Sequence, residues 1–334
     1  MSLFGSLRTA GSLPVEGQLA GFDGATGWLN SPPLSTADLR GKVVLVDFWT
    51  YTCINWLRTL AYVRGWAEKY EPHGLVVVGV HTPEFPFEKD VDNVSWSAKQ
   101  MNVAYPIALD PDYAVWRAFA NQYWPATYIA DGEGRIRHHQ FGEGGYAESE
   151  MVIQWLLREN RSSDVPDDLV SGDAGGLEAQ ADWANLESPE SYLGYEQGQN
   201  FASPGGAELD QARTYDVPEA LRLNQWALGG DWTVERGASV LNEPGGRIAF
   251  RFHSRDVHLV LGPRVRGASV PFRVLVDGEP PAGDHGADVD EDGTGTVVRQ
   301  RLYQLVRRRD GIGDATFEIS FAKSGVEAYV FTFG

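Results

Sequence analysis

Two runs of consecutive apolar residues constrain the fold of the first half of this chain more than any other feature. Residues 43–49 (VVLVDFW) and 75–80 (LVVVGV) are short and rich in β-branched side chains, so each predicts a buried strand. Between them, residues 57–70 place apolar side chains at helical spacing, and Gly74 ends that pattern. This order predicts an α/β fold with a central sheet that helices cover on both faces.

Further elements follow in the same half of the chain. The patterns predict helices over residues 90–101, 113–120 and 149–158. Two strands, 126–130 and 135–139, flank Asp131-Gly132-Glu133-Gly134, which is typical of a hairpin turn. We assign residues 1–160 to one α/β domain.

The pattern changes beyond residue 160. Residues 161–188 are polar and acidic, and we interpret them as a linker. Short alternating strands with Gly and Pro between them then indicate an all-β domain over residues 189–334, a β-sandwich of the jelly-roll kind. The predicted strands are 247–252, 257–261, 272–276, 301–306, 316–321 and 328–333.

Charge and hydropathy exclude some partners. The net charge is −18, and residues 161–219 hold thirteen Asp and Glu against two Lys and Arg, so a nucleic acid is not an expected partner. No stretch approaches the ~20 consecutive apolar residues of a spanning helix. The first 17 residues lack the features of a signal peptide, which favours a cytoplasmic protein, or an extracytoplasmic one if a leader has been removed.

The single cysteine, Cys53, is the candidate nucleophile. One cysteine excludes an intrachain disulfide and a multi-cysteine zinc site, and we expect neither metal nor cofactor. Cys53 follows the strand at 43–49 and directly precedes a helix. Because the backbone amides and the dipole of a helix N-terminus favour an anion, this position favours the reactive thiolate.

Several motifs carry a resemblance to a known family. Residues 41–49 followed by Cys53 resemble the active-site strand and turn of the thioredoxin superfamily, and residues 124–127 (WPAT) resemble its cis-proline loop. Residues 48–55, 80–85 and 191–195 are similar to DipZ-type thiol–disulfide interchange proteins. That resemblance implies a thioredoxin-like redoxin domain followed by a jelly-roll domain.

The chain departs from this family at the second active-site cysteine, where it has Trp56. A second thiol normally attacks the mixed disulfide and releases the partner, and an indole cannot do so. Turnover therefore requires an external thiol or a partner protein's cysteine. Two chemistries stay open for Cys53: reduction of a peroxide, for which Thr50 matches part of the peroxiredoxin signature, and disulfide exchange.

The resemblance also suggests roles for the neighbours of Cys53. Asp47 lies where thioredoxins have a buried acid that handles protons, and we group it with Thr50 and Cys53 as catalytic. His81, at the end of the second strand, is either a charged group that lowers the pKa of the thiol or a hydrogen-bonded structural histidine. The residues predicted to contact a substrate, including an extended peptide at the proline loop, are Trp49, Trp56, His81, Glu84, Trp124 and Pro125.

Two non-enzymatic interpretations remain beside the redox one. In the first, the thioredoxin-like fold keeps a docking groove for a protein, and Trp56 marks the loss of turnover. In the second, the β-sandwich binds carbohydrate through stacking on aromatic side chains, although aromatic residues of a sandwich are more often core. The candidates for such stacking are Trp226, Trp232, Tyr303 and Tyr329.

Overall fold

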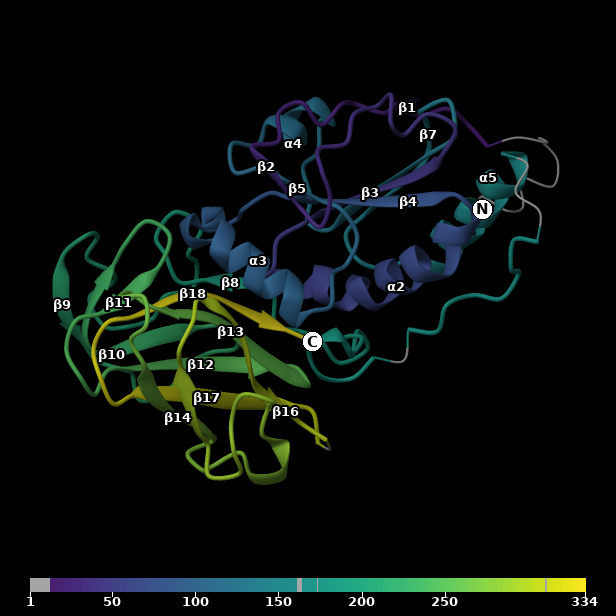
Figure 1. The fold of residues 1–334 in the computed structure, drawn as a ribbon. Helices are drawn as coiled ribbons and strands as arrows, with labels where there is room; N and C mark the ends of the chain where they lie inside the picture. Colours follow the sequence, from purple (N-terminus) through teal and green to yellow (C-terminus); the bar gives the residue numbers. More distant parts are fainter. Residues whose placement is uncertain (1–12, 161–163, 173, 310) are drawn as a thin grey trace. The chain divides into compact units, whose positions relative to one another are not determined.

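The computed structural model describes residues 13–160, 164–172, 174–309 and 311–334. The chain divides into two compact units, Met1–Glu178 and Ala179–Gly334 (Figure 1). The segment used for the leader prediction lies mostly outside the described residues. Within the described ranges, no helix combines the length and the apolar character needed to cross a membrane.

The first unit is built on a seven-stranded sheet with the order β1-β7-β6-β3-β4-β5-β2. Its central strand β3 pairs in parallel with β4 and antiparallel with β6. The predicted strands and the hairpin are confirmed, whereas the short strands β1, β2 and β5, of two or three residues each, were not predicted. The strands are β1 (Gly17–Gln18), β2 (Gly27–Leu29), β3 (Val43–Trp49), β4 (Leu75–His81), β5 (Ile107–Leu109), β6 (Ala126–Ala130) and β7 (Arg135–Phe141).

Helices cover both faces of this sheet, as predicted (Figure 1). Because side chains alternate along a strand, Val46 and Phe48 of β3 pack in one core cluster with Val115 of α4. Asp47 and Trp49 point to the other face, which α2 covers. The helices are α2 (Ile54–Tyr70), α3 (Val91–Gln100), α4 (Ala114–Ala118) and α5 (Tyr146–Glu159), with short 3₁₀ turns η1 (Glu71–His73), η2 (Pro86–Lys89) and η3 (Gly176–Glu178).

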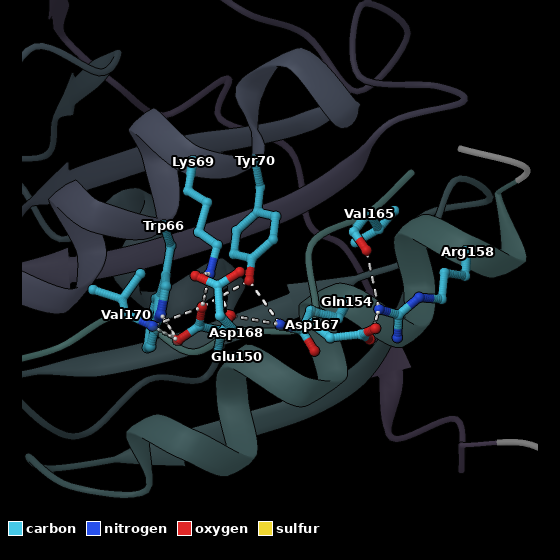
Figure 2. A network of polar contacts seen from close by, with 10 residues as sticks. All are labelled: Trp66, Lys69, Tyr70, Glu150, Gln154, Arg158, Val165, Asp167, Asp168 and Val170. Atoms are coloured by element: carbon cyan, nitrogen blue, oxygen red, sulfur yellow. Dashed lines mark hydrogen bonds and ion pairs between the residues drawn. The ribbon is translucent and has the colours of Figure 1, made fainter. Parts of the chain in front are cut away.

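Part of the acidic stretch that we interpreted as a linker is packed on the first unit. The buried carboxylate of Glu150 on α5 accepts hydrogen bonds from Trp66 Nε1 (3.0 Å) and Tyr70 Oη (2.7 Å) on α2 (Figure 2). It also accepts the backbone N–H of Val170 at 2.8 Å, and Lys69 Nζ lies 3.3 Å away. These contacts fasten the chain around Val170 to α2 and α5.

The second unit consists of antiparallel strands in one curled sheet with the order β15-β14-β17-β12-β10-β11-β18-β13-β16. All six predicted strands are present, so the all-β class is confirmed. In addition, β8 pairs with β18 and β9 with β10. The strands are β8 (Ser191–Tyr192), β9 (Ala212–Tyr215), β10 (Trp226–Val234), β11 (Ser239–Leu241), β12 (Arg247–His253), β13 (Asp256–Pro263), β14 (Val270–Val276), β15 (Thr294–Val297), β16 (Arg301–Arg307), β17 (Asp314–Phe321) and β18 (Val326–Phe333), and the turn η4 (Ala282–Asp284) precedes β15.

Strand β10 carries the sheet around its bend. Its first half, 226–229, pairs with β12, whereas 230–234 pair with β9 and β11. Gly230 lies at the change of partner with φ +93°, and a Cβ there would come within 2.9 Å of the Gly246 backbone. Only glycine tolerates both the positive φ and the close approach of the Gly246 backbone. Gly230 therefore allows the strand to turn here.

The bend encloses a core of aromatic and aliphatic side chains. Phe250 of β12 and Phe317 of β17 pack against Phe331 of β18, with ring centroids 5.0 and 5.6 Å apart. The four aromatic residues proposed for carbohydrate stacking also belong to the interior. Trp226, Trp232, Tyr303 and Tyr329 are buried, so the structure contradicts the proposed carbohydrate surface formed by these rings.

Candidate active site around Cys53

Cys53 lies at the N-cap of α2, where β3 delivers the chain through a tight turn. Its φ and ψ are −73° and 111°, and the first turn of α2 contains no acidic residue. Cys53 is partly exposed, whereas its neighbours Thr52 and Ile54 are buried. The site therefore combines solvent access with the helix N-terminus, which favours a thiolate.

Trp56 takes the place of a second thiol and points into the protein. Its side chain is 0% exposed. Its ring stacks on Trp49 with centroids 4.3 Å apart, and its Nε1–H donates to Asp47 Oδ2 at 2.9 Å. The indole thus lies in the interior and donates a hydrogen bond to the buried acid. Trp49 and Trp56 were predicted to contact a substrate, but burial removes both from the reach of a docked chain.

Asp47 is a buried acid that titrates near neutrality. Burial raises its pKa to about 7, while hydrogen bonds from Trp56 and Tyr105 act in the opposite direction. The Tyr105 hydroxyl lies 3.4 Å from Oδ2, and Oδ1 has no hydrogen-bond partner among the described residues. No sequence signal pointed to Tyr105, because it reaches Asp47 from the loop before β5.

His81 is fully buried between aromatic rings and is neutral. It packs edge-on against Trp49 (4.8 Å) and stacks on Tyr51 (5.8 Å). Burial lowers the pKa of His81 to about 3. A neutral imidazole lacks the positive charge through which His81 could lower the pKa of the Cys53 thiol. Nor can a buried ring contact a substrate, which corrects both roles suggested for His81.

Glu88, which the sequence analysis missed, connects the turn before Cys53 to the loop after β4. Its carboxylate is 1% exposed and accepts the Thr52 hydroxyl at 2.7 Å and the Thr52 N–H at 3.3 Å. The other oxygen accepts the N–H groups of Glu84 (2.7 Å) and Phe85 (2.9 Å). Burial raises the pKa of Glu88, and polar contacts with the Thr50 side chain, Phe85, Thr52 and Glu84 lower it. Only tertiary contacts distinguish Glu88 from other acids of the sequence.

The proline loop lies beside the loop after β4. The Trp124–Pro125 peptide is cis, as the resemblance implied. Trp124 is partly exposed, and its Nε1–H donates to the carbonyl of Thr82 at 3.1 Å. Glu84, from the same loop as Thr82, is also partly exposed. Of the predicted contact residues, Glu84 and Trp124 remain accessible to a partner, whereas Pro125 is buried.

Thr50 begins the turn that leads to the nucleophile. Its carbonyl accepts the Cys53 N–H at 3.2 Å, and its side chain is 0% exposed. Its described contact with Cys53 is therefore through the backbone. Across the described residues, no three His, Cys, Asp or Glu side chains come together in a way that could hold a metal ion.

The sequence matches the AhpC/TSA family over residues 26–139 and the thioredoxin-like C-terminal domain over residues 188–334. It is 31% identical over 136 residues to thiol-disulfide oxidoreductase YkuV of Bacillus subtilis, which covers 41% of this chain and 91% of YkuV. The chain belongs to the thioredoxin superfamily. A thioredoxin-like protein solved in its oxidised form has 30% identity and a TM-score of 0.40, covering 44% of this chain and 99% of that protein.

Within the thioredoxin superfamily, the chain is similar to DipZ-type proteins over almost its whole length. It is 35% identical over 328 residues to Protein DipZ of Mycobacterium tuberculosis, and the match covers 97% of this chain. The same match covers 44% of DipZ, so the chain spans less than half of that relative's length. Both units are included in the match.

Proposed function

We propose that this thioredoxin-superfamily chain is a thiol–disulfide oxidoreductase that works with one thiol. The Cys53 thiolate attacks one sulfur of a partner disulfide, a new S–S bond forms to Cys53, and the partner's other sulfur leaves as a thiolate. An external thiolate then attacks the partner's sulfur in that mixed disulfide. This second step oxidises the external thiol, joins it to the partner by a new disulfide and regenerates Cys53.

One observation carries the proposal: the position of a second thiol is filled by a buried indole, while Cys53 keeps its access to solvent. Trp56 is bonded to Asp47 and stacked on Trp49, and because Cys53 is the single cysteine, the chain has no second thiol to resolve the mixed disulfide. The Cys53 thiolate is favoured by the N-terminus of α2. The chain keeps its nucleophile, Cys53, but lacks a resolving thiol. These two facts together indicate a disulfide exchange that depends on a second molecule.

The named relative and the exposed residues near Cys53 support a proposal for the second molecule that exchanges disulfides with Cys53. YkuV is named a thiol-disulfide oxidoreductase, which supports the same class of reaction here. Glu84 and Trp124 are partly exposed on neighbouring loops joined by the Trp124–Thr82 hydrogen bond. We assign the partner as a cysteine-containing polypeptide that docks on these loops as an extended chain, or a small thiol.

The test is capture of a mixed disulfide by the reduced full-length chain. We expect one equivalent of oxidised glutathione to add one glutathionyl group to Cys53, detected by intact mass, and a small thiol to remove it. Cys53→Ser is the control and should add nothing. If the wild-type chain stays unmodified while an unstructured cysteine peptide reacts under the same conditions, the proposed exchange is wrong.

The match to the AhpC/TSA family favours peroxide reduction as a second candidate. In that reaction the Cys53 thiolate attacks a peroxide oxygen, the O–O bond breaks, and a sulfenic acid and an alcohol or water result. A stoichiometric peroxide pulse followed by a sulfenic-acid probe distinguishes the two reactions. A protein-binding module without turnover is the third candidate, and Cys53→Ser would then retain partner binding.

A further inference from the structure

The carboxylate of Glu88 is the point where the surroundings of Cys53 are held together. It is buried and receives four hydrogen bonds, two from Thr52 and one each from the backbone of Glu84 and Phe85. Thr52 directly precedes Cys53 in the chain. One side chain of η2 therefore fixes the residue before the nucleophile.

The same side chain also fixes the loop after β4. By binding the N–H groups of Glu84 and Phe85, Glu88 sets the course of the chain after β4. Two residues earlier than Glu84, the Thr82 carbonyl accepts the Trp124 indole. Two sets of hydrogen bonds thus link three segments of the site. The bonds to Glu88 join the turn before Cys53 to the loop after β4, and the bond from Trp124 to Thr82 joins that loop to the proline loop.

We propose that Glu88 is a positioning residue of this site, which holds Cys53 at the start of α2 and thereby sets the reactivity of the thiol. The inference rests on the proposed role of Cys53 as nucleophile. A thiolate at a helix N-terminus gains stabilisation only within the first turn, so its reactivity depends on the geometry of the N-cap. In Glu88→Gln only one oxygen remains as an acceptor, so either the Thr52 hydroxyl and N–H or the N–H groups of Glu84 and Phe85 face an amide NH2, and the turn or the loop must rearrange.

If Glu88 acted on Cys53 only through its negative charge, its loss would make the thiol more reactive. A buried carboxylate near a thiol disfavours the thiolate, so its neutralisation would lower the pKa of Cys53 and speed its reactions. A positioning role predicts that the thiol becomes less reactive when the carboxylate is lost. It also predicts that loss of the Thr52 hydroxyl, which leaves the charge of Glu88 in place, has the same effect.

The experiment compares Glu88→Gln and Thr52→Val with the wild-type full-length chain. The rate of iodoacetamide alkylation is measured against pH, and because the chain has one cysteine, the added mass reports Cys53 alone. We expect both variants to shift the midpoint of the profile upward by about one pH unit and to slow alkylation at pH 7 about tenfold. Glu68→Gln, an exposed residue of α2, is the control for loss of one negative charge and should keep the wild-type profile.

Thermal unfolding of each variant is recorded beside the kinetics. If Glu88→Gln does not fold, Thr52→Val decides the question. Wild-type profiles in folded variants, or faster alkylation of Glu88→Gln with no change in Thr52→Val, would overturn the inference. If the wild-type chain forms no mixed disulfide with oxidised glutathione and yet both variants shift, the proposed function fails while the role of Glu88 stands.

Discussion

Replacement of Asp47 by Asn should stabilise the first unit in a pH-dependent way. Asp47 is 0% exposed, and burial raises its pKa from the ordinary 3.8 to about 7. Asn has nearly the same shape and still offers an oxygen to the Trp56 indole. The substitution therefore removes the ionisation and keeps the contact that orders Trp56.

The size of this stabilisation follows from the difference between the pKa of Asp47 in the folded state and its pKa in the unfolded state. Below pH 3.8, Asp47 is neutral whether the chain is folded or unfolded, and its titration costs nothing. As the pH rises toward 7, the unfolded state releases this proton before the folded state does, so the free energy of unfolding falls. A difference of about three pKa units corresponds to about 4 kcal/mol, reached near pH 7 and constant above it. Between pH 5 and pH 8 the loss is about 3 kcal/mol.

Urea unfolding of both proteins at several pH values tests this prediction. The described α-helices all lie in the first unit, so far-ultraviolet circular dichroism follows its unfolding. The stability of Asp47→Asn relative to the wild type should rise from pH 5 to pH 7 and then level off. A difference that does not change with pH would contradict this prediction, because it would mean that Asp47 titrates alike in both states.

Three further predictions concern other parts of the molecule. Trp56→Cys should allow oxidation to form a disulfide between Cys53 and the introduced thiol, detected by the loss of two thiols, at a stability cost of about 3–5 kcal/mol for the lost indole. Glu150→Ala should destabilise the first unit by about 3–5 kcal/mol in urea unfolding, because it leaves the buried donors of Trp66 and Tyr70 without their acceptor and removes one of the two carboxylates paired with Lys69. Gly230→Ala should lower the thermal stability of the second unit by about 1–3 kcal/mol, because φ is +93° there.

Each of these has a matched comparison. Trp56→Phe keeps an aromatic ring without the thiol and should form no disulfide. Glu68→Ala changes an exposed acid of α2 and should alter stability by less than about 0.5 kcal/mol. Gly237→Ala adds a Cβ where nothing lies within 4 Å and should be tolerated. Equal effects at Glu150 and Glu68, or at Gly230 and Gly237, would contradict the explanations given.

The sequence predicted the elements whose side chains show a clear period. Strands β3, β4 and β6 are short apolar runs, and α2 repeats apolar residues at helical spacing, so local pattern was enough. Strand β10 was missed because Gly229 and Gly230 interrupt its alternation. Those glycines are required by the bend between two sets of partner strands, which is a property of the whole sheet rather than of the segment.

In the candidate site, too, local features could be predicted from the sequence, whereas contacts between distant residues could not. The place of Cys53 at the N-cap of α2 could be predicted because strand, turn and helix are contiguous in sequence. The bond from Trp56 to Asp47 and the bonds from Thr52 to Glu88 join residues nine and 36 positions apart. No local pattern encodes such pairs. The burial of His81 depends on packing against Trp49 and Tyr51, which sequence spacing does not report. The sequence therefore left a charged His81 open.

These contacts limit what can activate Cys53. Burial keeps His81 neutral, and the carboxyl groups of Asp47, Glu84 and Glu88 cannot supply a positive charge. The feature of the described site that favours the thiolate is the backbone at the start of α2. An indole N–H cannot take up or release a proton near neutrality, so Trp56 also cannot exchange a proton with Asp47 as a second thiol would. The reactivity of Cys53 therefore depends on backbone geometry, and the hydrogen bonds from Thr52 to Glu88 are the contacts that hold it.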